Sequence, residues 1–249
     1  MQHPGNLETK LKPFLDPSPR KSDYWERLFI LRSLEELAPC LNPGNILDVG
    51  CGLKPYENVL HQREAPYWGV DYPVTLANAH GMVSRADVFA DCLRLPFVSG
   101  AVDNVVCTQV LEHVREPDTL VREMARVLRP GGRLLLSAPM AWPLHEEPFD
   151  FYRYTVYGFR HLFQSAGLEI VKELERGQGV YALGQLFLTL MVEGPKQRHG
   201  LLWKVMTNAT CLMVNKSSPL LDRIWPKPGL CLGWTILAQK ASLTSRKHE

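Results

Sequence analysis

A regular alternation of strand-like and helix-like segments between residues 45 and 175 constrains the fold of this chain more than any other feature. Helical patterns run over 117–128, which Pro117 opens, and over 155–166, where Thr155 stands in the N-cap position. Alternating strands and helices predict an α/β fold with a mostly parallel, doubly wound sheet. The strand-like segments are 45–50, 67–72, 82–87, 102–108, 133–138 and 168–175.

The flanking segments predict a single domain with additions at both ends. Residues 1–21 are rich in proline and polar residues and are expected to form a flexible arm before a helical pattern at 23–40. The expected organisation is a core at 22–175, a helical insertion at 176–233, a last core strand at 234–240 and a tail at 241–249.

Composition indicates where in the cell the protein is expected. The six cysteines are widely spaced and contain no C-x-x-C pair, which argues against a disulfide framework and a zinc cluster. The N-terminus has no apolar signal-like region, and the longest nearly apolar run, 180–192, is too short to span a bilayer. We therefore expect a cytoplasmic protein that is, in one alternative, peripheral to a membrane.

A glycine-containing turn follows the first strand-like segment. In "ILDVGCG", Gly50 and Gly52 allow the backbone to turn tightly and to approach a ligand. The third glycine of a dinucleotide-binding G-x-G-x-x-G motif is absent, since Pro55 occupies its position. Asp48 precedes the turn, and its carboxylate would repel a pyrophosphate but attract a cationic ligand.

Two more acids follow the next two strand-like segments. Asp71 ends the segment at 67–72 and is suited to accept both hydroxyls of a ribose. Asp91 follows the third segment, and its carboxylate is suited to accept a hydrogen bond from an exocyclic amine. Turn capping is the alternative for any one of these aspartates, but acids at three consecutive strand ends favour a ligand site.

Five motifs, "ILDVGCG", "GVDY", "DCLRLPF", "VDNVVCTQVLEHV" and "RVLRPGGRLLLSAP", together resemble the class I S-adenosylmethionine-dependent methyltransferases, most closely the type 11 subgroup. This resemblance covers about residues 45–175. It implies a Rossmann-like, seven-stranded sheet whose antiparallel last strand is "WTILAQK", and S-adenosylmethionine as the cofactor.

The resemblance also implies roles for particular residues. Gly50 and Gly52 would line the methionine part of the cofactor, and Asp48 would support their turn. Asp71 would bind the ribose, and Asp91 with the Cys92 backbone N–H would hold the adenine. Gln109 is expected to face the methionyl end, with Leu111 and His113 on the turn after it, whereas Asp103 is interpreted as structural.

The segment "LHEEPFDFYRYT" at 144–155 follows the fifth strand and is therefore expected over the site of methyl transfer. A metal site is disfavoured, because the segment lacks H-E-x-x-H spacing and contains Pro148. In one interpretation it is a capped loop, with an Asp150–Arg153 pair and a Thr155 cap. In the other it is a substrate lid.

The lid interpretation supplies a base for an oxygen nucleophile, because histidine titrates near neutral pH. His145 is the first candidate and His113 the second, with Glu146 as the orienting partner.

The segment between the sixth and last strands is about 58 residues long, and nearly all of its charged residues are basic. The whole C-terminal part of the chain is basic as well. Residues 194–249 hold nine Lys or Arg against two acids, a net charge of +7, while the rest of the chain carries −5. Its apolar helices are either core helices or a surface that contacts an anionic membrane or a lipid-linked substrate.

The expected function is methyl transfer to oxygen or carbon of a small or lipid-linked acceptor. The alternative is a non-catalytic protein that binds the cofactor or docks a partner. A nucleic-acid partner is not expected.

Overall fold

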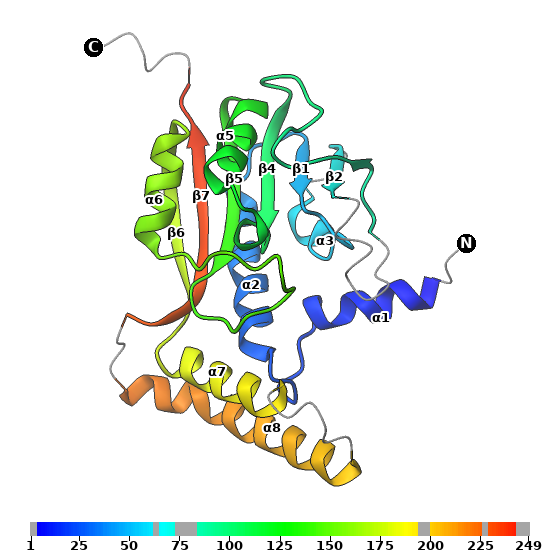
Figure 1. The fold of residues 1–249 in the computed structure, drawn as a ribbon, viewed down its shortest axis with the longest axis vertical. Coiled ribbons are helices and arrows are strands. Elements are labelled where there is room, and N and C mark those ends of the chain that lie inside the picture. Colours follow the sequence, from blue (N-terminus) through cyan, green and yellow to red (C-terminus); the bar gives the residue numbers. More distant parts are fainter. Residues whose placement is uncertain (1–3, 62–64, 73–83, 194–199, 226–228, 243–249) are drawn as a thin grey trace.

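The computed structural model describes residues 4–61, 65–72, 84–193, 200–225 and 229–242. Its centre is a seven-stranded sheet in the order β3-β2-β1-β4-β5-β7-β6, in which β7 is antiparallel to both of its neighbours (Figure 1). The predicted fold class is confirmed. The strands are β1 (Ile46–Val49), β2 (Tyr67–Asp71), β3 (Val88–Phe89), β4 (Val102–Thr108), β5 (Leu128–Pro139), β6 (Leu168–Gln178) and β7 (Cys231–Lys240).

Helices cover both faces of the sheet and create two apolar cores. Successive strand residues point to opposite faces, so Val105 packs in the core beneath α5 and α6 while Val106 packs in the core beneath α2 and α3. The helices are α1 (Pro4–Leu15), α2 (Tyr24–Leu37), η1 (Ala38–Cys40), α3 (Glu57–Leu60), η2 (Leu111–His113), α5 (Pro117–Val127), α6 (Val156–Ser165), α7 (Val180–Glu193) and α8 (Leu201–Ile224).

Several local predictions are confirmed. β4 spans the predicted residues 102–108, and α5 begins at Pro117. Thr155 caps α6, since its hydroxyl accepts a hydrogen bond from the Gly158 N–H at 3.2 Å. Asp103 is structural, as interpreted: its carboxylate accepts from the Asn45 N–H at the opposite end of the sheet.

The predicted strand at 82–87 is wrong where the structure can test it. Residues 82 and 83 lie outside the described residues, and 84–87 do not form a strand. The strand lies at Val88–Phe89, where it pairs with the end of β2. The Asp87 carboxylate accepts the Gly69 N–H at 2.7 Å, so a side chain takes up a β2 backbone group at that point. The Asp87 N–H also donates to the Gly69 carbonyl at 2.8 Å, whereas the Arg85 N–H donates to the Gly52 carbonyl of the glycine turn, so the chain joins β2 only from Asp87 onward.

The N-terminal arm also differs from the expectation, because residues 4–15 form helix α1. Near the end of α1, the Phe14 ring meets the edge of the Tyr56 ring, with centroids 6.1 Å apart. The Arg27 guanidinium lies 4.5 Å from the centroid of the same Phe14 ring. Contacts with the core therefore fix a segment whose composition alone favours a loop.

Helices α7 and α8 form a hairpin beyond the end of the sheet at which β6 finishes and β7 begins (Figure 1). Because β6 runs parallel to β5, this is also the end at which the parallel strands finish. In a doubly wound sheet, ligands bind outside the carboxyl ends of the parallel strands. The hairpin thus lies on the functional side of the sheet.

The hairpin has polar residues on its packed side and apolar residues on its exposed side. Gln185 is buried and caps α2 by accepting the Trp25 N–H at 3.0 Å, and Asn215 donates to the Pro19 carbonyl at 2.9 Å. The exposed large apolar side chains recur at helical spacing, with Leu183, Phe187 and Leu190 on α7 and Leu202, Val205, Met206, Met213, Leu220 and Ile224 on α8.

These outward faces are not part of the core. Among the described residues, none of the helices combines the length and the apolar character needed to cross a bilayer.

Candidate active site

The turn after β1 forms the centre of the carboxyl edge. Gly50 and Gly52 adopt φ values of +71° and +49°, a region that favours glycine. A Cβ on Gly50 would lie 2.3 Å from Val110, so this position admits no side chain. Next to Gly52, by contrast, the corresponding space holds no atom of the described residues within 4 Å. The turn therefore leaves an open approach to its backbone at Gly52.

Asp48 lies buried beneath this turn with half of its carboxylate unsatisfied. Its Oδ2 accepts from the Tyr67 hydroxyl at 2.7 Å, while Oδ1 has no hydrogen-bond partner among the described residues. Burial raises the pKa of Asp48 to about 7, although the Tyr67 hydroxyl and the Lys54 ammonium oppose this rise. An unpaired buried carboxylate oxygen is costly, and a cationic group would offset that cost.

Asp71 is the last residue of β2, and it contacts the glycine turn directly. Its Oδ2 accepts from the Gly52 N–H at 3.1 Å and from the Ser84 hydroxyl at 3.0 Å, and its Oδ1 accepts from the Tyr72 N–H at 2.8 Å. A carboxylate offers about four acceptor positions. Three are in use, so accepting two ribose hydroxyls would require Ser84 to release its bond.

Asp91 follows β3 and is exposed at the same edge. Its Oδ1 accepts from the Leu93 N–H at 2.9 Å, which is the turn-capping geometry that was the alternative for this residue. Cys92, whose backbone N–H is the expected adenine contact, is half-buried next to it. Turn capping holds the Asp91 carboxylate in place and leaves acceptor positions on it.

An ion pair that the sequence analysis missed braces this part of the edge. Lys54 is buried, and its Nζ lies 2.5 Å from Asp87 Oδ2. The pair ties the end of the glycine turn to the chain before β3. The sequence carries little signal for it, because the two residues lie 33 positions apart and no motif contains both of them.

The end of β4 carries Gln109 and Leu111. Gln109 adopts φ +56°, and its amide lies against the Ser137 hydroxyl at 3.0 Å. Leu111 is fully buried, and its carbonyl accepts from the Tyr154 hydroxyl at 3.1 Å. The Leu111 side chain therefore belongs to the apolar core.

Three metal-binding or proton-accepting side chains meet at η2 and the loop after β5. Glu112, His113 and His145 each place a ligand atom within 4.8 Å of the others, and the two imidazole centroids are 4.7 Å apart. Glu112 is fully buried, and neither of its carboxylate oxygens has a hydrogen-bond partner among the described residues. Burial raises its pKa to about 8. The sequence analysis did not single out Glu112.

The carboxylate next to His145 is Asp150, whereas Glu146 was the expected orienting partner. Asp150 Oδ2 lies 3.3 Å from His145 Nδ1, and Glu146 Oε2 instead lies 3.8 Å from His113 Nε2. Burial lowers the pKa of His145, and the adjacent His113 lowers it further. The lowered pKa favours the neutral form of the His145 ring.

The loop itself is held by the pair that the sequence predicts. Arg153 donates to both oxygens of Asp150, at 2.6 and 2.7 Å, and to the Pro143 carbonyl at 2.8 Å. Burial would raise the pKa of Asp150, but the hydrogen bonds from Arg153 and from the His145 N–H lower it to about 2. The capped-loop features and the proximity of His145 to the edge coexist in one structure.

A buried ion pair closes the edge on the β5 side. Arg176 is 1% exposed, donates to Glu26 Oε1 at 2.7 Å, and donates to the Ala138 carbonyl at 3.0 Å. It joins β6, β5 and the first turn of α2. The sequence analysis missed this pair as well, because neither residue belongs to a motif.

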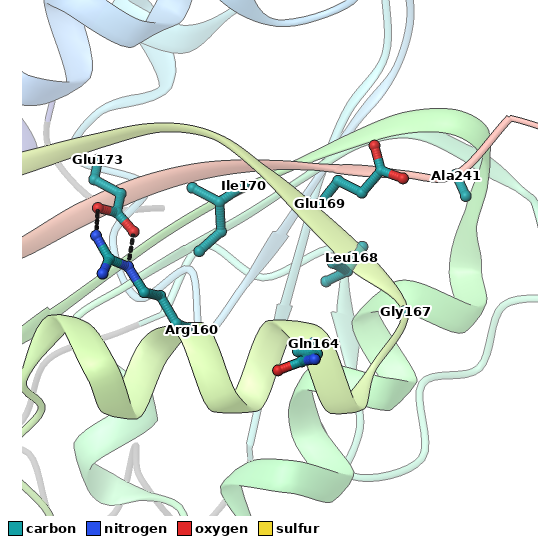
Figure 2. Close-up of a pocket in the computed structure, with 8 residues that line it drawn as sticks. All are labelled: Arg160, Gln164, Gly167, Leu168, Glu169, Ile170, Glu173 and Ala241. Carbon is teal, nitrogen blue, oxygen red and sulfur yellow. Dashed lines mark hydrogen bonds and ion pairs between the residues drawn. The ribbon is translucent and has the colours of Figure 1, made fainter. Parts of the chain in front are cut away.

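A surface hollow between α6 and β6 is a poor candidate for the functional site (Figure 2). Gly167 and Leu168 lie at the start of β6, and Ala241 follows the end of antiparallel β7. The hollow is therefore at the amino end of the parallel strands. Of its charged groups, Arg160 and Glu173 are already paired with each other at 2.6 Å (Figure 2).

Residues 47–136 match the family model described as "Methyltransferase domain". This segment contains β1 to β4, most of β5 and the aspartates and glycines at the carboxyl edge. This match agrees with the resemblance of the sequence motifs to class I, S-adenosylmethionine-dependent methyltransferases of type 11.

Curated relatives with similar sequences are ubiquinone biosynthesis O-methyltransferases. The chain is 30% identical to that of Bordetella avium over 159 residues, which are 61% of this chain and 60% of the relative. It is also 30% identical to that of Sodalis glossinidius over 151 residues, 55% of this chain and 56% of the relative. Both matches span less than two thirds of the relative's length.

Solved structures with the same fold include the cyclase SpnF, with a TM-score of 0.58 and 19% identity over 95% of this chain and 93% of that chain. Geranyl diphosphate methyltransferase in complex with S-adenosylmethionine has a TM-score of 0.51 and 17% identity over 92% of this chain and 94% of that chain. At these identities the similarity concerns the fold alone.

Proposed function

We propose that this protein methylates an oxygen atom of a small, lipid-linked acceptor, using S-adenosylmethionine. The observation that carries the proposal is the continuous row of ligand-suited groups along one edge of the sheet, in the strand order β3-β2-β1-β4-β5. The O-methyltransferase relatives support oxygen as the methylated atom.

The residues at the edge fit this cofactor. Asp48 has a buried, unpaired oxygen that suits a cationic group, and the space beside the Gly52 Cα is open to a ligand. We assign Asp71 to the ribose hydroxyls, Asp91 with the Cys92 N–H to the adenine, and Gly50 and Gly52 to the methionine part. When bound, S-adenosylmethionine supplies an electrophilic methyl group on a positively charged sulfur.

We assign the proton transfer to the histidine pair. His145, whose pKa is lowered by burial, accepts the proton of the acceptor hydroxyl; the Pro143 carbonyl orients the ring through Nδ1, and Asp150 holds the His145 backbone N–H. His113 is the second candidate, and its Nδ1 lies 2.8 Å from the Phe149 carbonyl oxygen. The loop that carries His145 then acts as the acceptor lid.

The α7–α8 hairpin supports a lipid-linked acceptor and peripheral contact with a membrane. Its outward face is apolar and lies on the functional side of the sheet, and Lys204, Lys216 and Arg223 are exposed on α8. Apolar area together with basic residues favours an anionic lipid surface. Lys196 and Arg198, which belong to the same basic segment, lie outside the described residues.

A fold does not by itself specify methyl transfer, and the fold similarity to a cyclase illustrates this. The test is release of S-adenosylhomocysteine when purified protein, S-adenosylmethionine and candidate acceptors are combined. Prenylated hydroxy-aromatic acceptors should give product, and their water-soluble head groups should give less. A protein that binds the cofactor yet methylates none of these would instead be a non-catalytic cofactor-binding protein.

A further inference from the structure

The cluster at η2 contains a buried acid for which the reaction described above has no use. Glu112 is fully buried at the active edge, and both of its carboxylate oxygens lack hydrogen-bond partners among the described residues. A buried carboxyl group without hydrogen-bond partners destabilises the folded state. The backbone around it is well held, since the Glu112 carbonyl accepts from the Phe151 N–H at 2.9 Å. The Glu112 carboxylate therefore needs a binding partner, and the described protein residues do not supply one.

The two histidines next to Glu112 are oriented in the way that metal-binding histidines are. His113 Nδ1 lies 2.8 Å from the Phe149 carbonyl oxygen, and His145 Nδ1 lies 3.3 Å from the Pro143 carbonyl oxygen and 3.3 Å from Asp150 Oδ2. Each Nδ1 thus has an acceptor for its proton, which leaves the lone pair of a neutral ring on Nε2. A carbonyl or carboxylate bonded to the second ring nitrogen is the usual arrangement behind a metal-ligating histidine.

The distances suit a shared cation better than direct hydrogen bonds. His113 Nε2 lies 3.8 Å from Glu112 Oε1 and 3.8 Å from Glu146 Oε2, too far for a hydrogen bond in either case. Two ligand atoms that each lie about 2.1 Å from one ion are separated by roughly 3–4 Å. Small side-chain rotations within the 4.8 Å cluster would therefore complete a coordination sphere.

We propose that Glu112, His113 and His145 bind a divalent transition-metal cation, with Glu146 able to provide a fourth ligand. Two imidazoles and one carboxylate select zinc-like ions over magnesium or calcium, which prefer all-oxygen sites. Sequence analysis disfavoured a metal in 144–155 because that segment lacks a metal-binding spacing of its own. The fold supplies the other ligands from η2, which is more than 30 residues away in the chain.

The cation would also assist methyl transfer by activating the acceptor, and this consequence rests on the proposed function. An acceptor hydroxyl bound to the open position of such an ion loses its proton more readily, since the ion stabilises the oxyanion. His145 is then a ligand, and the free-base role assigned to it above applies only to the metal-free protein. The binding of the cation itself depends on neither the cofactor nor the acceptor.

The experiment titrates the full-length, chelator-treated protein with Co²⁺ and with Zn²⁺ in the absence of cofactor and acceptor. We expect one ion per chain, visible d–d absorption bands for Co²⁺, and displacement of Co²⁺ by Zn²⁺ but not by excess Mg²⁺. Glu112→Gln, His113→Gln and His145→Gln should each weaken binding at least a hundredfold, because loss of outer-shell partners alone costs 10–100-fold.

The matched control is His161→Gln, because His161 is an exposed histidine on α6 away from the edge. It should bind the ions as the parent does. The proposal is wrong if the three cluster variants retain parental affinity, if His161→Gln weakens binding as much as they do, or if Mg²⁺ alone binds. Melting temperatures measured without metal separate a ligand effect from misfolding: parental values accompanied by lost binding support the site. Because no methyl transfer is measured, failure here leaves the proposed reaction standing.

Discussion

Asp48→Asn should remove a pH-dependent loss of stability from this protein. Burial raises the pKa of Asp48 to about 7 from its ordinary value of 3.8. The folded state therefore holds this proton more tightly than the unfolded state. The resulting stability is fully present below pH 4 and is lost as the pH rises through 7. At about 1.4 kcal/mol per pKa unit, the full loss is about 4 kcal/mol, of which about 3 kcal/mol falls between pH 5 and pH 8.

The assay is urea unfolding of the parent and of Asp48→Asn at several pH values from 5 to 8, without cofactor. The free energy of unfolding of the variant minus that of the parent should increase by about 3 kcal/mol across this range. Groups common to both proteins cancel in this difference. Tyr67→Phe removes the donor that opposes the rise in pKa, so its transition should move to higher pH. A difference that stays constant with pH would refute the reasoning about Asp48.

His145→Ala should lower the turnover number 10²–10⁴-fold while cofactor affinity stays parental; unchanged turnover at saturating acceptor would return the loop to a structural role. Arg176→Met should lower the free energy of unfolding by about 3–5 kcal/mol, because it leaves the Glu26 charge buried and unpaired, and a loss below 1 kcal/mol by urea unfolding would contradict this. Vesicles with anionic lipid should sediment the protein at low salt and release it at high salt, and the double substitution Lys204→Glu, Lys216→Glu should weaken this by about 1 kcal/mol per residue. Indifference of the protein to such vesicles at low salt would refute the proposed membrane contact.

The sequence predicts those parts of the fold that depend on local pattern. Apolar periodicity located β4 and α5 closely, and glycine and aspartate at strand ends located the edge that carries the site. The strand at 82–87 was misplaced because Arg85 bonds to Gly52 in the glycine turn and the chain reaches β2 only at Asp87, contacts that no local pattern encodes.

What the sequence does not predict is burial by distant segments. Glu112 appears as an ordinary acid in "VLEHV" until the 144–155 loop covers it, and Arg176 appears exposed until α2 brings Glu26 to it. The α7 and α8 helices were expected to be either core or surface, since their apolar residues fit both. Only the positions of Gln185 and Asn215 beneath the hairpin show which face turns outward.

The most direct test of the account is calorimetric titration of the purified protein with S-adenosylmethionine. The parent should bind one molecule per chain. Asp71→Ala and Asp91→Ala should each bind at least tenfold more weakly, since a hydrogen bond to a charged group contributes about 1.5–3 kcal/mol. Asp118→Ala, which removes an exposed acid on α5, should bind as the parent does. Absence of binding by the parent, or parental affinity in both edge variants, would contradict the assignment of this edge to the cofactor.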